Sequence, residues 1–225
     1  MSFRFWKRKK ADMDIVKIDP NIPDKKIITG AVQILKKGGV VMYPTDTAYG
    51  LAADIEGGAG IENIFKIKGR IKQKTLPLIA GSRAMADKYV NWTPMGKKMA
   101  QKFWPGPLTL VLESRIMNFE SKICRKYVIR QGKIAIRVPD NKIAQMISKK
   151  LGRPITSTSA NISGKNECYS VAEFLNQAIG KKWLPDLILD AGKLPKRKPS
   201  TIVDATKDQI IVIRKGETNF YDLAV

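Results

Sequence analysis

The sequence predicts a single α/β domain, classed as α+β in some schemes, in which helices flank a twisted sheet of mixed parallel and antiparallel strands. Short apolar runs rich in Val, Ile and Leu alternate with amphipathic stretches of helical length. Some neighbouring apolar runs lie too close together for a crossover helix, so part of the sheet must be antiparallel. The chain has 225 residues and neither an internal repeat nor a low-complexity linker, so we expect one core.

The first predicted elements are a strand at 15–18 and a helix that begins at Asp24 and ends at Gly38. Asp24 can cap this helix because its carboxylate can accept hydrogen bonds from the first free N–H groups, and glycine commonly ends a helix. A buried strand at 40–43 follows, and we expect Pro44 to stop it. Apolar periodicity predicts the rest of this half: a helix at 59–68 before Gly69, a strand at 77–80, and helices at 83–90 and 94–103.

The second half is predicted to hold more strands than helices. Apolar, β-branched runs predict strands at 108–112 and 134–138. Asp140 is the expected cap of a helix that runs to Lys150, with Gly152 just beyond its end. The same patterns predict the remaining elements: strands at 154–156, 187–189, 201–203 and 210–213, and a helix at 171–179.

We expect residues 1–12 to be a disordered basic tail, residues 13–218 to form the domain, and residues 219–225 to be a C-terminal tail. No apolar run follows the basic residues of the first segment, so it does not resemble a signal peptide, and Met13 stays open as an alternative start. No stretch reaches the length of a transmembrane helix. These features predict a cytoplasmic protein with no membrane partner.

The balance of charge favours an anionic ligand or partner. The chain carries 41 Lys and Arg residues against 20 Asp and Glu residues, a net charge of +21. A field of this sign attracts nucleotides, RNA and other polyanions. The alternative is a lysine-rich composition that has no specific role.

The reactive side chains exclude several kinds of catalysis. Histidine is absent, which removes Ser-His-Asp and Cys-His catalysis and histidine-ligated metals. The two cysteines, Cys124 and Cys168, are far apart and lack a neighbouring ligand pattern, so we predict no metal site and a reducing compartment. Chemistry must come from Lys, Arg, carboxylates, hydroxyls and the backbone.

Four segments could bind a ligand. Hydroxyls and a carboxylate follow the strand that ends at Pro44, where α/β sheets commonly bind ligands, although an ordinary turn has the same composition. Basic residues occupy alternate positions from Lys66 to Lys74, which on an extended chain would form a phosphate-binding strip, or else a solvated edge. Small polar residues at 157–164 and 199–204 would let a phosphate approach backbone N–H groups, and Arg214 could add a bidentate contact.

In this order, the segments YPTDTAYGL, KGR followed by K-x-LPL, WPGPLT, IRVP, STSANISG and PSTIVD resemble the YrdC-like threonylcarbamoyl-AMP synthases, in their short, single-domain form. The resemblance covers about residues 14–216 and implies a YrdC/RibB-like fold. It implies a nucleotidyltransferase that condenses L-threonine, bicarbonate and ATP, with Mg²⁺, to threonylcarbamoyl-AMP and pyrophosphate. The product serves the threonylcarbamoyladenosine (t6A) modification of tRNA, which the protein would meet directly or through a threonylcarbamoyl transferase complex.

The resemblance also implies roles for single residues. Its KxR…SxN signature corresponds to the expected catalytic residues Lys68, Arg70, Ser159 and Asn161. The nucleotide would be bound by Arg70, Lys74, Thr109, Ser159 and Arg214. L-threonine or its carbamate would be held by Thr47, Ser157 and Ser200.

Three other functions stay open at this point. A YciO-like paralogue would share the fold but have little synthase activity, and such proteins typically lack the KxR and SxN pairs that this chain has. An RNA-binding protein of the same fold would use the positive charge without chemistry. Another carboxylate-activating enzyme would differ only in its substrate.

Overall fold

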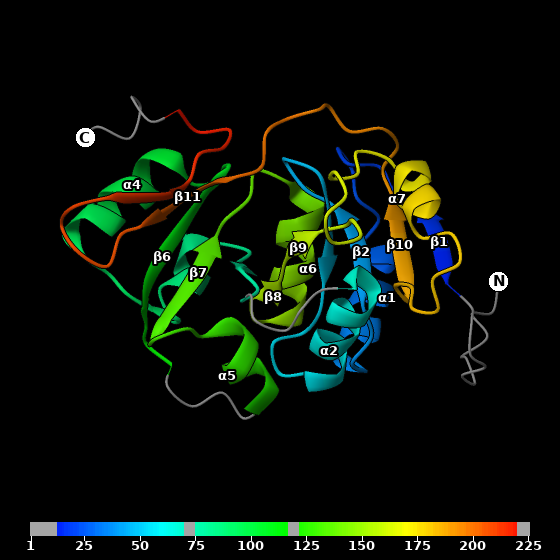
Figure 1. The fold of residues 1–225 in the computed structure, drawn as a ribbon, viewed down its shortest axis with the longest axis horizontal. Helices are drawn as coiled ribbons and strands as arrows, with labels where there is room; N and C mark the ends of the chain where they lie inside the picture. The colour runs from blue at the N-terminus through cyan, green and yellow to red at the C-terminus, as the bar shows by residue number, and fades with distance from the viewer. Residues whose placement is uncertain (1–12, 70–74, 117–121, 220–225) are drawn as a thin grey trace.

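The computed structural model describes residues 13–69, 75–116 and 122–219. The strands form two sheets that lie beside each other along the long axis of the molecule (Figure 1). Each sheet mixes parallel and antiparallel pairs, and helices flank them. The predicted fold class is therefore confirmed, although the strands are divided between two sheets and do not form one.

The first sheet has the strand order β1-β10-β2-β3-β9. Its strands are β1 (Asp14–Lys17), β10 (Leu187–Asp190), β2 (Val41–Pro44), β3 (Tyr49–Ala52) and β9 (Thr158–Ser159). β10 runs parallel to both of its neighbours, and β3 runs antiparallel to both of its neighbours. Pro44 is the last residue of β2, where it pairs with Tyr49, so it belongs to the strand that it was expected to stop.

The second sheet has the order β12-β11-β6-β7-β4-β8, with β5 beside β6. Its strands are β4 (Leu78–Ile79), β5 (Val90–Asn91), β6 (Leu108–Ser114), β7 (Lys133–Arg137), β8 (Ile155–Thr156), β11 (Thr201–Asp204) and β12 (Ile211–Arg214). The chain passes directly from β8 in this sheet to β9 in the other, and Ser157 is the single residue between them. Ser157 therefore stands where the two sheets meet.

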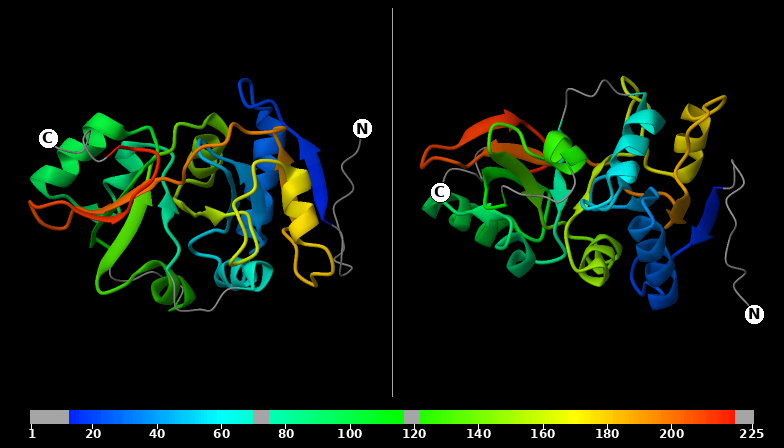
Figure 2. Two further views of the ribbon diagram at one scale, coloured as in Figure 1. Left: turned by 45° about the horizontal axis from the view of Figure 1, so that its top comes forward. Right: turned by 90° about the horizontal axis from the view of Figure 1, so that it is seen from below.

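Seven helices are present in the described residues: α1 (Lys25–Lys36), α2 (Gly58–Lys68), α3 (Arg83–Ala86), α4 (Pro94–Phe103), α5 (Lys122–Val128), α6 (Lys142–Leu151) and α7 (Val171–Gln177). α1 and α6 lie side by side against β2 (Figure 2). In the part of the chain that the structure describes, no helix is both long and apolar enough to cross a membrane.

The caps confirm one predicted helix start and correct another. The Asp24 carboxylate accepts a hydrogen bond from the Lys26 amide at 2.6 Å and caps α1 as expected. The cap of α6 is Asn141, whose side-chain oxygen accepts from the Ala144 amide at 3.0 Å, so the prediction of Asp140 was wrong. The Asp140 amide instead donates to the Asp46 carboxylate at 3.1 Å, which draws Asp140 away from the helix start.

Several short elements were not predicted. The expected helix at 83–90 ends at Ala86, because the chain turns there into β5. The strands β3 and β9 and the helix α5 were also missed. These elements are short, and a strand of two residues has no apolar periodicity that could reveal it.

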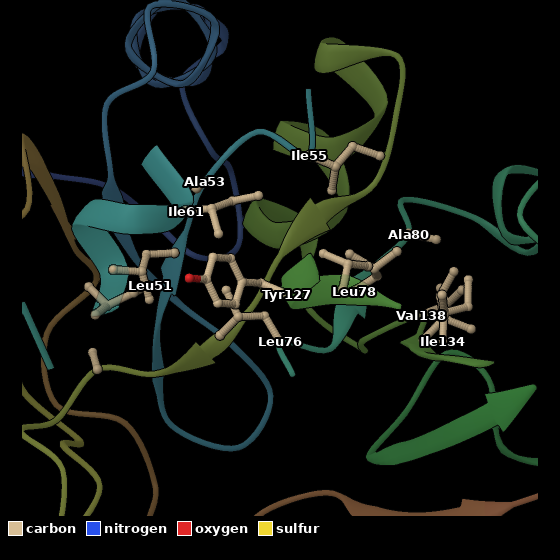
Figure 3. Packing of buried hydrophobic residues seen from close by; sticks show 14 of the residues in the cluster. Leu51, Ala53, Ile55, Ile61, Leu76, Leu78, Ala80, Tyr127, Ile134 and Val138 are labelled. Atoms are coloured by element: carbon tan, nitrogen blue, oxygen red, sulfur yellow. The ribbon is translucent and has the colours of Figure 1, made fainter. Parts of the chain in front are cut away.

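A continuous apolar core joins the two sheets. Leu51 from β3 and Ile61 from α2 belong to the same buried cluster as Leu78 and Ile134 of the second sheet (Figure 3). Tyr127 of α5 lies in this cluster, with its ring 4.6 Å from that of Phe65. Shared burial of this kind makes the two sheets one packing unit.

The two cysteines lie inside this core and should not react in the folded protein. Cys124 and Cys168 are fully buried, and burial raises their thiol pKa values to about 12 and about 11. Because the thiolate is the reactive form, we expect neither thiol to react with Ellman's reagent at pH 8 within minutes. Both should react in guanidinium chloride, and rapid reaction in native buffer would contradict the buried placement.

Candidate active site

A cleft of about 950 Å³ lies between the two sheets. Its first wall comes from the β2–β3 turn, β3 and the 157–164 loop, and its second wall comes from β6, β7, β11 and β12. Alternation along β6 explains the second wall. Thr109 and Val111 face the cleft, whereas Leu108 and Leu110 face the core. The segment 191–200 crosses from β10 to β11 (Figure 1). Ser200, at the end of this segment, lines the cleft.

The β2–β3 turn fixes Thr47 on the first wall. The Thr45 hydroxyl donates to the Ala48 carbonyl at 2.6 Å and accepts hydrogen bonds from the amides of Thr47 and Ala48. The hydroxyls of Thr45 and Thr47 lie 3.1 Å apart. Thr47 is thus held with its side chain at the cleft, where the prediction requires it.

A buried ion pair ties this turn to the second sheet. Arg137 of β7 donates to the Asp46 carboxylate at 2.6 Å, and both side chains are almost fully buried. The other Asp46 oxygen accepts from the Asp140 amide. The Asp46 carboxylate, which sequence reasoning counted among the ligand-binding groups of this turn, is therefore engaged within the protein.

Three of the four signature residues form one cluster. The Lys68 ammonium is buried and donates to the carbonyls of Ser159 and Asn161, at 2.5 and 2.9 Å, and to the Asn161 side-chain oxygen at 2.8 Å. The Ser159 hydroxyl donates to the same Asn161 oxygen at 2.6 Å. Lys68, Ser159 and Asn161 all line the cleft. The Lys68 ammonium therefore holds Ser159 and Asn161 of this loop together.

The basic strip takes a different form from the one expected. Lys66 and Lys68 lie in α2, so they project in different directions and do not align as on an extended chain. The exposed Lys66 ammonium lies 4.4 Å from the centre of the Trp183 ring, whereas Lys68 is buried. The prediction of an extended basic strip is therefore wrong for Lys66 and Lys68. Arg70 and Lys74 lie outside the described residues.

A second cluster lies on the opposite wall. Arg214 donates to the carbonyl of Ser200 at 2.8 Å and to its hydroxyl at 3.0 Å, and the hydroxyls of Thr109 and Ser200 lie 2.9 Å apart. Burial lowers the pKa of the Arg214 guanidinium, the charge of Glu167 opposes this shift, and the charge of Arg137 adds to it. Ser200, predicted to hold the amino acid, thus contacts two residues predicted to hold the nucleotide.

Sequence reasoning did not single out Tyr43 or the other partners of the site residues. The Tyr43 phenol is fully buried and donates to the Ser157 hydroxyl at 2.8 Å. Arg137, Glu167 and Lys133 also line the cleft. Arg137 alone had a sequence signal, because it is a charged residue that ends a run of apolar strand residues.

The cleft is more basic than acidic. Its described cationic side chains are Lys68, Arg130, Lys133, Arg137, Arg197 and Arg214, and its described carboxylates are Glu167 and Asp204. Asp204 pairs with Lys133 at 2.9 Å. Within residues 13–69, 75–116 and 122–219, no three His, Cys, Asp or Glu side chains gather as a metal site would require. The arrangement suits an anionic ligand that has several hydrogen-bonding oxygens.

The fold and the cleft define an α/β protein with a basic, hydroxyl-lined cavity between two sheets. The family model Sua5/YciO/YrdC, described as telomere recombination, matches residues 33–216. The chain belongs to the Sua5/YciO/YrdC family.

The chain is similar both to proteins named threonylcarbamoyl-AMP synthase and to the protein named YciO. A putative threonylcarbamoyl-AMP synthase of Methanocaldococcus jannaschii is 32% identical over 200 residues, which are 89% of this chain and 90% of the relative. A threonylcarbamoyl-AMP synthase of Vibrio vulnificus is 34% identical over 183 residues, 80% of this chain and 94% of the relative. The uncharacterised protein YciO of Escherichia coli is 31% identical over 200 residues, 88% of this chain and 93% of the relative.

Solved structures agree with the fold. Sua5 of P. abyssi, crystallised with L-threonine, superposes with a TM-score of 0.80 at 28% identity and is matched over 95% of this chain. The chain spans 60% of the length of that protein. E. coli YciO superposes with a TM-score of 0.77 at 29% identity, over 93% of this chain and 97% of that one.

Proposed function

We propose that the chain is an L-threonylcarbamoyladenylate synthase, which forms threonylcarbamoyl-AMP and pyrophosphate from L-threonine, bicarbonate and ATP. The observation that carries the proposal is the cluster of Lys68, Ser159 and Asn161 on the cleft wall. It faces a cleft whose opposite wall holds Thr109, Ser200 and Arg214. Basic groups on both sides of one cavity are what the joining of two anionic substrates requires.

The reaction needs an anionic nucleophile to approach an anionic phosphate. The threonine amine attacks the carbon of bicarbonate to give a carbamate and water, and a carbamate oxygen then attacks the α-phosphorus of ATP. A phosphorus–oxygen bond to the β-phosphate breaks, and pyrophosphate leaves. Positive charge lowers the cost of this approach, and positioning supplies much of the remaining acceleration.

The two walls suggest a division of labour. Arg214 and Thr109 would hold the nucleotide, and Ser200, which contacts both, would lie where the nucleotide and the amino acid meet. Thr47 and Ser157 on the first wall would hold L-threonine. Mg²⁺ would arrive with ATP as part of the substrate, because Mg²⁺ keeps several waters and binds largely through phosphates.

A YciO-like protein without synthase activity is the alternative, since YciO is about as similar in sequence as the named synthases. The presence of the KxR and SxN pairs favours the synthase. We also propose a cytoplasmic site of action, with tRNA reached directly or through a transferase complex. The positive net charge would suit an RNA-binding role beside the chemistry.

Release of pyrophosphate from Mg·ATP tests the proposal. We expect release that needs both L-threonine and bicarbonate and that falls when L-serine replaces L-threonine. Mass spectrometry should find the mixed anhydride as the other product. Well-folded protein with no threonine-dependent release would reject the synthase and leave the YciO-like or RNA-binding function.

A further inference from the structure

Ser157 receives a hydrogen bond from a residue that does not line the cleft. Ser157 lies between β8 and β9, and its side chain lines the cleft. The Tyr43 phenol approaches it from the buried side, at 2.8 Å. Tyr43 belongs to β2, 114 positions earlier in the chain, and is fully buried.

The proton of this contact belongs to Tyr43. A phenol in a buried site donates its proton to the nearest acceptor, and here that acceptor is the Ser157 oxygen. Burial raises the pKa of Tyr43, outweighing the smaller opposing effects of Ser157 and Arg137, so the phenol stays protonated at neutral pH. Ser157 therefore acts as the acceptor in this hydrogen bond at neutral pH.

A serine hydroxyl has one proton and two acceptor positions. With one acceptor position occupied by Tyr43, the Ser157 proton remains to be donated elsewhere. Among the described residues, Tyr43 is the partner of the Ser157 hydroxyl, and the Ser157 amide donates separately to the Pro77 carbonyl. The open side of the hydroxyl is the cleft.

The packing around the pair limits its movement. Gly50 pairs with Tyr43 across the β2–β3 ladder. A Cβ on Gly50 would lie 3.3 Å from the Ser157 hydroxyl oxygen and 3.4 Å from a Tyr43 ring carbon. Even one added carbon at position 50 would therefore contact both the Ser157 hydroxyl and the Tyr43 ring tightly, so the pair is closely packed on this side.

We propose that Tyr43 is a positioning residue that makes Ser157 a fixed hydrogen-bond donor to the carboxylate of the amino-acid substrate. A hydroxyl that donates its proton into the cleft favours an anionic oxygen over an ammonium or an amide N–H. Without the phenol, the serine hydroxyl would rotate and lose part of this preference. The inference rests on the proposed function. It makes Tyr43, which lies outside the cleft, one of the residues that determine substrate specificity.

Tyr43→Phe tests the proposal because it removes the phenol oxygen and keeps the ring. We expect the KM for L-threonine to rise about five-fold, as the loss of one oriented bond to a charged group implies, while the KM for ATP and kcat stay within about two-fold. L-threoninamide, which lacks the carboxylate, should compete as well with the variant as with the wild type. Tyr127→Phe makes the same change in another buried tyrosine and should leave all these constants unaltered.

A cycle with Ser157→Ala separates positioning from a general loss of packing. Tyr43→Phe should have no further effect on the KM for L-threonine once Ser157 is alanine, and an additive effect would overturn the proposal. Equal rises in both KM values would also overturn it. If Tyr43→Phe fails to fold, Ser157→Ala alone must raise the KM for L-threonine and leave the inhibition by L-threoninamide unchanged. Wild-type protein without threonine-dependent turnover would reject the proposed function, and the inference with it.

Discussion

Replacing Lys68 by methionine should lower the rate of threonine-dependent pyrophosphate release at least about 100-fold. Methionine has a similar length but no charge, so it cannot donate to the Ser159 and Asn161 carbonyls or to the Asn161 side chain. The loop that carries the serine and asparagine of the signature would lose its central support. Initial rates at saturating Mg·ATP, L-threonine and bicarbonate measure the effect.

The same change should also lower stability, because two buried acceptors and one partly buried acceptor would lose a charged donor. We expect the free energy of unfolding in urea to fall by roughly 1–3 kcal/mol. Lys66→Met is the matched control: it removes the same charge two positions earlier in α2, where the side chain is exposed. Its rate should stay within about two-fold of the wild type. A Lys68→Met protein with full activity would show that the buried charge is not needed.

The parts of the fold that local chemistry determines could be predicted from the sequence. Asp24 opens α1, and Gly69 and Gly152 end α2 and α6 in left-handed backbone conformations, with φ of 57° and 82°. The division into two sheets could not be predicted, because it depends on which strands pair across long stretches of chain. Nothing in the two-residue strands β8 and β9 indicates that Ser157 separates two sheets.

The candidate site shows the same division. The hydroxyl-rich segments and the signature residues were visible as motifs, and the described ones do line a common cleft. Their partners were not visible, because Tyr43 meets Ser157 across 114 positions and Arg137 meets Asp46 across 91. The burial of Lys68 was missed for a related reason. A lysine in a basic run is normally solvated, and only the tertiary fold turns it toward the 159–161 loop.

The ion pair between Asp46 and Arg137 should be the most costly single contact to break on the cleft walls. Asp46→Asn leaves the Arg137 guanidinium with its side chain only 8% exposed and without its carboxylate partner. Removing one partner of a buried pair typically costs about 3–5 kcal/mol, and we expect a loss near the lower figure in urea unfolding. The KM for L-threonine should rise as well, because Thr47 is the next residue in the turn.

Lys133→Met provides the contrast, since it breaks the Lys133–Asp204 pair at the other end of β7, where the side chains are 34% and 19% exposed. A pair in contact with solvent contributes at most about 1 kcal/mol, so the two variants should differ clearly. Combining Asp46→Asn with Arg137→Met should restore part of the lost stability, because no buried charge then lacks a partner. Equal unfolding midpoints for Asp46→Asn and the wild type would mean that this pair does not hold the β2–β3 turn to the second sheet. Thr47 would then owe its position to the Thr45 hydrogen bonds alone.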